Sequence, residues 1–534
     1  MPGRVRAALA ALLKSAHADP LRALGWLVAV IATVYVVVYP FTVVHYPPMT
    51  DLPFHAAQMS VFRHYDNPAW HFREQFTLHP LQVPYISAYL IGAALSLIMP
   101  VTWAAKGMAI SMLLLLPAGL AVLFHGMRKS PLWGLVGLGF VWSNMSHFGF
   151  LDFVGATGLY AACVGCTLLA LDRPSRRHQI ALGAALAALF FTHVYRFPFA
   201  LLAIVATTAV MYPATRRIRP VLVPWLSATA LFGVWMLARP PALRAGLGHL
   251  SFHTERFHEL PGYLFKNYRG ATGTEERHIA VGMLAVFVAL LVISALLALR
   301  RRRSVEHDPA DRRWAAGVTV LPVLLAAGHL FAYFVLPMGM GVWWYIFPRE
   351  ALGTAFILVA VVPDLPSHQW LRLGAVTAIA LATGSMSYLV ARRWHDFDQL
   401  TWDFRAIMAE VPRAPKLFYL VYDHSGTDRI RSPFTHLPAW VQAEKGGWLG
   451  FHFAMWGTYP VRYRKGGVVP PRVPDDWEFT PQYFQVKKQG VWFDTFLVRH
   501  HIDPHQLFDP DPSIHLVAQR GTWWLYRRKR QHGR

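Results

Sequence analysis

Long apolar runs recur along most of the chain, and they restrict its fold more than any other feature. They lie near residues 22–44, 84–100, 105–124, 131–147, 151–171, 179–194, 197–212, 220–238, 279–299, 314–336, 349–363 and 371–391. Each run is close to the roughly 20 residues that an α-helix needs to cross the hydrocarbon core of a bilayer. Hydrophobic residues make up 54% of the chain, more than ordinary water-soluble domains contain. We therefore predict an α-helical polytopic membrane protein with about 11 to 13 transmembrane helices.

The positive charges gather in short loops between these runs. The formal net charge is +22, and arginines cluster at residues 172–179, 214–220, 299–304 and 311–314. Such clustering is typical of cytoplasmic loops beside anionic lipids. The chain has no basic stripe interleaved with aromatic residues, the pattern of single-strand nucleic-acid binders. We therefore expect membrane lipids, and no nucleic acid, as partners of this charge.

The same rule orients the chain. Arg4, Arg6 and Lys14 predict a cytoplasmic N-terminus, and the arginine-rich loops leave the C-terminal region on the outer side. An even number of crossings cannot join these two ends, so one apolar run must fail to cross. We assign this failure to residues 131–147, which are short and rich in glycine.

Two regions follow from the composition. Residues 1–393 form the predicted membrane domain, with a large first outer loop at 45–83 and a second at 239–278. Residues 394–534 contain more charged residues and prolines, and they carry β-branched and aromatic runs bounded by Gly, Pro or Asp. We interpret them as a small α/β or α+β domain outside the cytoplasm.

The first outer loop opens with the sequence TDLPFH, which places an aspartate and a histidine four residues apart. If a helix begins at Thr50 or Asp51, then Asp51 and His55 share one face, one turn apart. A carboxylate and an imidazole could there act on one ligand. The alternative is that Asp51 only caps the helix N-terminus and has no chemical role.

Other polar residues lie at the outer ends of the apolar runs. They are His147, Asp152, His193, Arg196, Trp343, Trp344, Tyr345 and Arg349. Taken singly, the aromatic residues would form an interfacial belt and each arginine would extend towards lipid headgroups. Together, they supply acid, imidazole and guanidinium groups at one membrane depth. Such convergence is typical of a cleft that binds a charged lipid head.

The layout resembles the GT-C superfamily of membrane glycosyltransferases. The shared features are a cytoplasmic start, a first span, a large outer loop that opens with an acidic motif (here TDLPFH), many further spans and an outer C-terminal domain. The resemblance implies transfer of a sugar from a polyprenyl-phosphate carrier to a glycan, lipid or protein acceptor on the outer face. Many members carry two acids in this loop, whereas here Leu52 and Pro53 follow Asp51.

The resemblance also implies roles for individual residues. Asp51 would be the general base on the acceptor hydroxyl or would orient it, with His55 positioning the carboxylate or the acceptor. Arg349, and after it Arg196, would stabilise the leaving lipid phosphate, and inversion at the anomeric carbon would follow. The other donor-binding candidates are His147, Asp152, His193, Trp343, Trp344 and Tyr345. A divalent cation, Mg²⁺ or Mn²⁺, stays open as a cofactor with Asp51 as its ligand.

Two other functions remain open. A transporter or flippase for a lipid or glycan would also line its path with polar residues, although the predicted spans contain few acids or lysines. A non-catalytic protein of envelope assembly would explain the missing second acid. The Arg- and Ala-rich composition indicates a bacterial chain, so we expect the inner membrane as its location.

Overall fold

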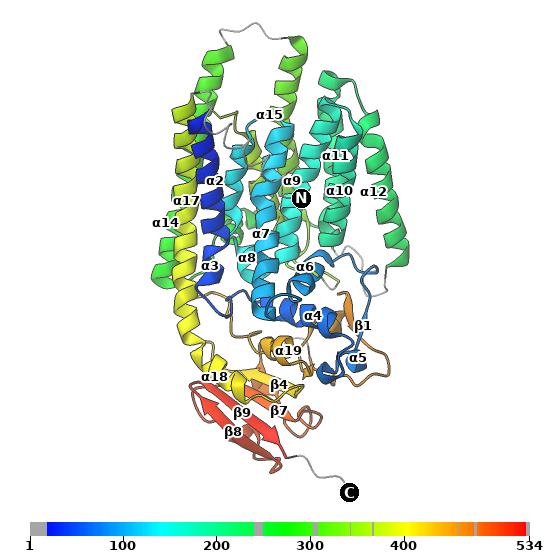
Figure 1. Ribbon diagram of the computed structural model, residues 1–534, viewed down its shortest axis with the longest axis vertical. Helices are drawn as coiled ribbons and strands as arrows, with labels where there is room; N and C mark the ends of the chain where they lie inside the picture. Colours follow the sequence, from blue (N-terminus) through cyan, green and yellow to red (C-terminus); the bar gives the residue numbers. More distant parts are fainter. Residues whose placement is uncertain are drawn as a thin grey trace, which may run out of the picture.

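The computed structural model describes residues 19–239, 249–302, 308–341, 343–365, 368–457, 459–474 and 478–529. A tall helix bundle makes up most of the molecule, and a smaller mixed domain lies at one end of it (Figure 1). The predicted basic residues Arg4, Arg6 and Lys14 lie outside the described residues, as do residues 240–248 of the second outer loop.

Eight helices in the described residues are long and apolar enough to cross a membrane. They include α2 (Pro20–Val37), α7 (Val101–Gly126), α9 (Leu151–Asp172), α11 (Phe197–Thr215), α12 (Arg219–Ala238), α14 (Gly270–Arg302), α15 (Pro309–Val335) and α17 (Gln369–Leu400). The chain is thus a multi-pass membrane protein. Most of α9 is buried inside the bundle, whereas only 6% of the apolar window of α14 is buried, as expected of a helix that faces lipid.

Local sequence signals fix several helix starts. The Asp19 side chain accepts a hydrogen bond from the Arg22 backbone N–H at the start of α2 (3.1 Å), and Asp308 accepts one from Ala310 at the start of α15 (2.9 Å). Ser175 does the same for α10 (Arg176–Thr192). These caps satisfy N–H groups that have no partner within the helix.

Glycines bring α7 and α9 into close contact at the centre of the bundle. A Cβ atom on Gly119 of α7 would lie 1.9 Å from the carbonyl oxygen of Gly158 on α9, and one on Gly126 would lie 2.4 Å from that of Gly165. Small residues are the usual means of packing membrane helices backbone to backbone. These two glycine pairs therefore set the distance between α7 and α9.

The chain path through residues 125–150 differs from our prediction. The Lys129 ammonium donates to the carbonyl oxygens of Ala360 (3.0 Å) and Val362 (2.6 Å) at one end of the bundle. At the other end, the carbonyl oxygen of His147 accepts from the Thr50 backbone N–H at 3.3 Å. Residues 131–147, including the 3₁₀ helix η2 (Pro131–Phe140), therefore traverse the bundle, and our assignment of them as the failed span is wrong.

Among the predicted spans, the segment that does not cross the bundle is residues 84–100. Its helix α6 (Ser87–Leu95) has nine residues, a length of about 14 Å at 1.5 Å per residue, and it lies beside the first loop at the end that carries the C-terminal domain (Figure 1). The corrected path also explains the charge at residue 128, because Arg128 pairs with Asp172 (2.5 Å) and Asp311 (2.9 Å) in the arginine-rich loops.

The C-terminal domain is a mixed α/β structure, as predicted. The five strands are β4 (Lys416–Val421), β5 (Trp448–Leu449), β7 (Thr495–Arg499), β8 (Ile514–Arg520) and β9 (Trp523–Arg528). Their order is β5-β4-β7-β9-β8, with β4 parallel to β5 and β7 and the β8–β9 hairpin antiparallel. Helix α17 continues to Leu400, past residue 394, and is followed by α18 (Trp402–Glu410).

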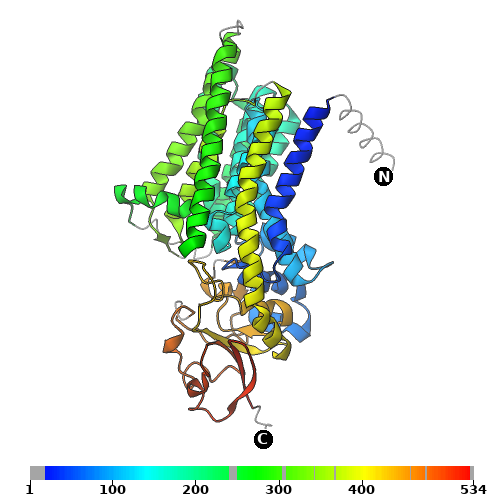
Figure 2. The same cartoon turned by 90° about the vertical axis from the view of Figure 1, so that its left-hand side faces the viewer.

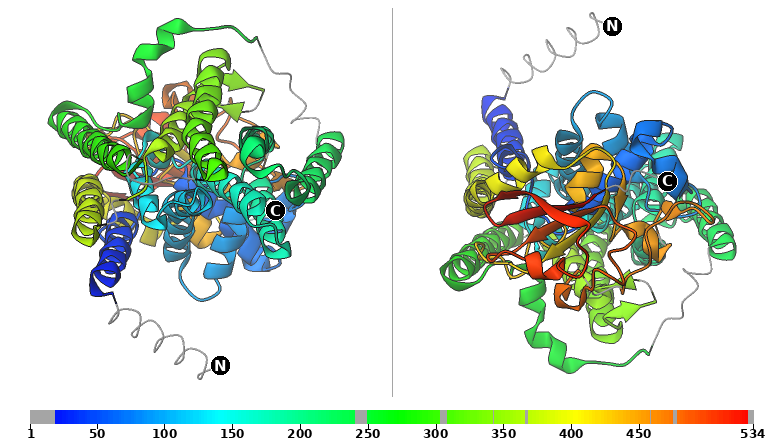
Figure 3. Two further views of the ribbon diagram at one scale, coloured as in Figure 1. Left: turned by 90° about the horizontal axis from the view of Figure 1, so that it is seen from above. Right: turned by 90° about the horizontal axis from the view of Figure 1, so that it is seen from below.

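The first loop and the C-terminal domain form one layer across the end of the bundle (Figures 2 and 3). Helix α4 (Leu52–His64) packs on α19 (Ala439–Lys445). Strand β1 (Phe76–Leu78) pairs antiparallel with β6 (Val461–Tyr463). Two segments far apart in sequence are thus joined where this layer meets the ends of the membrane helices.

Candidate active site

Asp51 is the N-cap residue of α4, but its side chain makes no capping hydrogen bond. The preceding chain is held instead by the turn after α8 (Asn144–Phe148): the Asp51 backbone N–H donates to the carbonyl oxygen of Phe148 at 2.9 Å. Gly149 follows with φ +92°, and a Cβ there would lie 2.9 Å from the Asp51 nitrogen. Glycine is therefore required at this close approach. The Asp51 carboxylate therefore does not cap α4, and the alternative that it serves only as a helix cap is wrong.

The carboxylate faces a histidine of the C-terminal domain. Nδ1 of His436 lies 3.2 Å from Oδ1 of Asp51, and Nε2 of the same ring lies 3.2 Å from Oε2 of Glu478. Burial by itself lowers the pKa of His436, but the charge of Glu478 and the contact with Asp51 outweigh this effect and raise it to about 10. His436 is therefore an imidazolium at neutral pH, placed between two carboxylates.

His55 follows Asp51 by one helical turn, as predicted, but its ring contacts other groups. Nδ1 lies 2.8 Å from the Tyr89 hydroxyl, and Nε2 lies 3.2 Å from the carbonyl oxygen of Gly149. Burial lowers the pKa of His55, so its ring is neutral at pH 7. His55 therefore packs beside Asp51 and contacts Tyr89 and Gly149. The imidazole that contacts the Asp51 carboxylate is that of His436.

A cavity of about 980 Å³ opens beside Asp51, between the bundle and the C-terminal domain. Predicted site residues from four separate turns line it: Asp51, His55, Asp152, His193, Trp343, Trp344 and Arg349. The C-terminal domain contributes a further side, which includes Arg431, His436, Tyr459 and Glu478. The convergence expected from the sequence is thus present for seven of the predicted residues.

Arg349 carries a positive charge into this cavity without an acidic partner. Its Nε and Nη2 donate to the carbonyl oxygens of Tyr345 (3.1 Å) and Trp344 (3.2 Å), and Nη1 lies 2.9 Å from Nε2 of His193. Its guanidinium lies over the Phe150 ring, 4.8 Å from the centroid. Among the described residues, no carboxylate is within ion-pair distance of it. Carbonyl oxygens and an imidazole thus hold the guanidinium, and its charge has no acidic partner among the described residues.

Arg196, the second predicted phosphate contact, lies elsewhere. Its Nη1 pairs with Oε2 of Glu350 at 2.7 Å, and Nδ1 of His329 lies 2.7 Å from the same oxygen. Arg196 and Glu350 are fully buried, and neither lines the cavity beside Asp51. The charge of Arg196 is thus already neutralised inside the bundle.

A smaller cavity of about 510 Å³ adjoins the first and contains the remaining predicted residues, His147 and Tyr345. The Tyr345 hydroxyl donates to Oδ1 of Asn144 at 3.0 Å, and His147 contacts Arg429 of the C-terminal domain. Arg431 lines both cavities, and its guanidinium lies 4.0 Å from the centroid of Phe148. It therefore stands between the two spaces.

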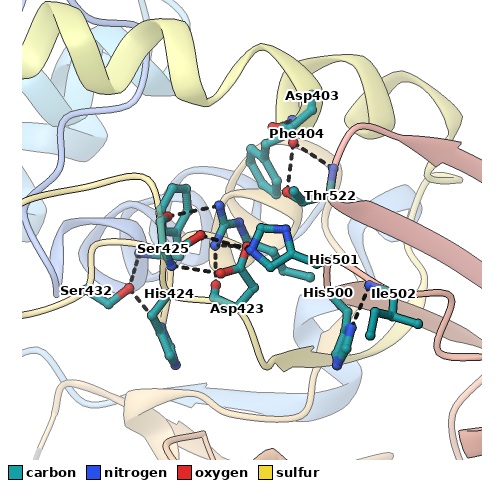
Figure 4. A network of polar contacts seen from close by, with 12 residues as sticks. Asp403, Phe404, Asp423, His424, Ser425, Ser432, His500, His501, Ile502 and Thr522 are labelled. Atoms are coloured by element: carbon teal, nitrogen blue, oxygen red, sulfur yellow. Dashed lines mark hydrogen bonds and ion pairs between the residues drawn. The ribbon is translucent and has the colours of Figure 1, made fainter.

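The segment from Asp423 to His436 brings the C-terminal residues to the cavity. The Asp423 carboxylate fixes its start, because it pairs with Arg499 at the end of β7 (3.0 Å) and with His501 (3.0 Å). Figure 4 shows Asp423 beside His501. Sequence reasoning missed this contribution. The sequence signal for it is the series of histidines and arginines that follows β4, namely His424, Arg429, Arg431 and His436.

The described residues around Asp51 can be compared with the ligand set that a metal ion needs. In the part of the chain that the structure describes, no group of three or more His, Cys, Asp or Glu side chains is arranged to hold a cation. Asp51 and Glu478 come from different regions, and the His436 ring lies between their oxygens. The described residues beside Asp51 therefore present no set of three ligands for the expected divalent cation.

Comparison with known proteins gives a fold match. No protein-family model and no curated protein matches the chain. ArnT from Cupriavidus metallidurans bound to undecaprenyl phosphate is similar at TM-score 0.53 and 14% identity, over 94% of this chain and 98% of ArnT. Its apo state matches at the same score, over 95% and 98%. Arabinofuranosyltransferase AftD from mycobacteria gives TM-score 0.41 and 14% identity, over 95% of this chain and 40% of AftD. The likeness to ArnT confirms the predicted fold class: a bundle of membrane helices with a small C-terminal sheet domain, similar in fold to ArnT.

Proposed function

We propose that this chain is a membrane glycosyltransferase that moves a sugar from a polyprenyl-phosphate-linked donor to an acceptor. The observation that carries the proposal is the 980 Å³ cavity, which unites the Asp51 carboxylate with the unpaired charge of Arg349 at the end of the membrane bundle. A transferase of this kind needs a base for the acceptor and a cation for the leaving phosphate.

Arg349 supplies the cation. Its guanidinium binds the lipid phosphate and stabilises the negative charge that grows as the sugar leaves. Trp343, Trp344 and the phenylalanines that line the same cavity give the sugar and the isoprenoid an apolar surface. ArnT, which has a similar fold, is known in a complex with undecaprenyl phosphate, and this supports a lipid carrier of the same class for the present chain.

Asp51 supplies the base. The acceptor hydroxyl transfers its proton to the Asp51 carboxylate, and its oxygen forms a bond to the anomeric carbon. The bond from that carbon to the phosphate oxygen breaks on the opposite side, and the polyprenyl phosphate leaves with the electron pair. Attack from the face opposite the leaving group inverts the anomeric centre.

The sidedness follows from the charges. The arginine-rich loops lie at the bundle end opposite the cavity, so the positive-inside rule assigns the cavity and the C-terminal domain to the outer face. We propose the bacterial inner membrane as the location and an envelope glycan, lipid or protein as the acceptor.

The test replaces Asp51 by Asn in the native host at equal membrane levels and profiles envelope glycans and lipid-linked sugars. We expect Asp51→Asn to reproduce the glycan defect of a deletion strain. The control is Asp66→Asn in the same loop, which among the described residues forms one ion pair, an exposed one with Arg73. A deletion defect that Asp51→Asn does not share would reject this base, and a deletion without a glycan defect would favour transport or envelope assembly.

A further inference from the structure

The contact between Asp51, His436 and Glu478 joins the membrane domain to the C-terminal domain at the reacting end of the cavity. The three side chains are 16%, 7% and 6% exposed, respectively. Nδ1 of His436 also lies 3.0 Å from the carbonyl oxygen of Thr50, so the ring touches the residue before Asp51 as well as Asp51 itself. Both ring nitrogens of His436 thus face acceptor oxygens.

Two nearly buried carboxylates close to one ring require a positive charge between them. Without it, each acid would lose its water and would face the charge of the other. In other carboxylate sites that charge is often a divalent cation held by oxygen ligands. Here the ring occupies the space between the acids, so a cation could bind both only by displacing His436.

The ring also fixes which Asp51 oxygen is open. Oδ1 faces Nδ1 of His436, whereas Oδ2 has no protein partner among the described residues. Asp51 lines the cavity, so Oδ2 is the atom available to an acceptor hydroxyl. A carboxylate held through one oxygen keeps a single orientation, which favours a productive geometry for proton transfer.

We propose that the His436 side chain replaces the divalent cation of this site. It joins Asp51 to a second carboxylate, Glu478, and holds Asp51 in position as base, so that transfer proceeds without Mg²⁺ or Mn²⁺. This inference rests on the proposed function. The second acid that is absent beside Asp51 is supplied by Glu478 of the C-terminal domain, and His436 is a positioning residue.

The first test measures binding and needs no activity. Purified full-length protein in detergent micelles is titrated with MnCl₂, and free Mn²⁺ is followed by electron paramagnetic resonance. We expect the titrations of wild type and Asp51→Asn to coincide. Bound Mn²⁺ that disappears in Asp51→Asn would overturn the inference, even if the chain proves not to be a glycosyltransferase.

The second test uses membranes that form the glycan product lost in Asp51→Asn. We expect the wild-type rate to be the same in EDTA and in added Mg²⁺. His436→Ala should lower the rate on the order of 100-fold through misplacement of the base, and added imidazole or Mg²⁺ should restore part of it, which loss of packing alone would not allow. His515→Ala, on an exposed position of β8, is the matched control.

Three results of this second test would overturn the inference. They are a wild-type rate that falls in EDTA and returns with Mg²⁺, a His436→Ala rate equal to that of wild type, and a lost rate that neither addition restores. Failure of the proposed function is distinguishable, because it leaves the product unchanged in Asp51→Asn, and the Mn²⁺ titration still decides the inference.

Discussion

Replacing His436 by Gln should change how the stability of the protein depends on pH. Glutamine fills a similar space and can still donate a hydrogen bond, but it cannot carry the charge that lies between Asp51 and Glu478. The pKa of His436 rises from 6.5 in the unfolded chain to about 10 in the folded protein. A raised pKa means that the folded state binds the proton more tightly, so protonation stabilises it.

The size of the effect follows from these two pKa values. The stabilisation is fully present below pH 6.5 and is lost as the pH rises through 10. At pH 7 it amounts to about 4 kcal/mol, from 1.36 kcal/mol for each pKa unit between pH 7 and 10 less a small correction for partial protonation of the unfolded chain. At pH 10.5 it is close to zero.

The assay is equilibrium unfolding of wild type and His436→Gln in detergent micelles, followed by tryptophan fluorescence from pH 6 to pH 10.5. We expect the difference in unfolding free energy to be largest at pH 6, the lowest pH of the series, and to shrink by about 4 kcal/mol between pH 7 and pH 10.5. His515→Gln should follow wild type throughout. A difference between wild type and His436→Gln that stays constant over this pH range would refute an imidazolium between the two acids.

Three further predictions address the phosphate site, the aromatic wall and the bundle. Arg349→Ala should weaken binding of undecaprenyl phosphate at least tenfold in a native mass spectrometry titration, because a charged contact contributes about 1.5 to 3 kcal/mol; unchanged binding would remove Arg349 from that role. Trp343→Leu should lower turnover with little change in stability if the ring contacts substrate, whereas intact turnover would assign it to the interfacial belt. Gly158→Ala should destabilise the protein by about 1 to 3 kcal/mol, because its Cβ would meet the Leu115 carbonyl oxygen at 2.0 Å; Gly183→Ala on α10, with open space around it, is the control in the same unfolding assay.

The membrane helices could be predicted because hydropathy is a local property. The apolar runs that became α7, α9 and α15 each carry enough residues to span a bilayer, whatever they pack against. The signals for the strands of the C-terminal domain were equally local, since β-branched and aromatic runs bounded by turn residues predict strands. The fold class therefore followed from the sequence.

The path through η2 and α6 could not be predicted from hydropathy. Residues 131–140 form a 3₁₀ helix, which rises about 2.0 Å per residue in place of 1.5 Å, so a run that looks short for a span covers more of the bilayer. Residues 84–100 are as apolar, but only Ser87–Leu95 are α-helical. Arg128 and Lys129 were the informative signal, because the positive-inside rule already opposed an outer position for them.

Helical spacing predicted that Asp51 and His55 lie on one face, but it could not predict the partner of the Asp51 carboxylate. The spacing of four predicted a shared face, and both side chains do line the cavity. The charged ring that contacts Asp51, however, is that of His436, which no periodicity connects to it. The partner of a carboxylate at a domain boundary comes from the segment that packs against it, so this pairing is a property of the tertiary fold.

The contact with His436 also makes the proposed base depend on the C-terminal domain. A substitution that displaces the segment from Asp423 to His436 should impair transfer and leave lipid binding unchanged, because Arg349 forms its hydrogen bonds with residues of the bundle.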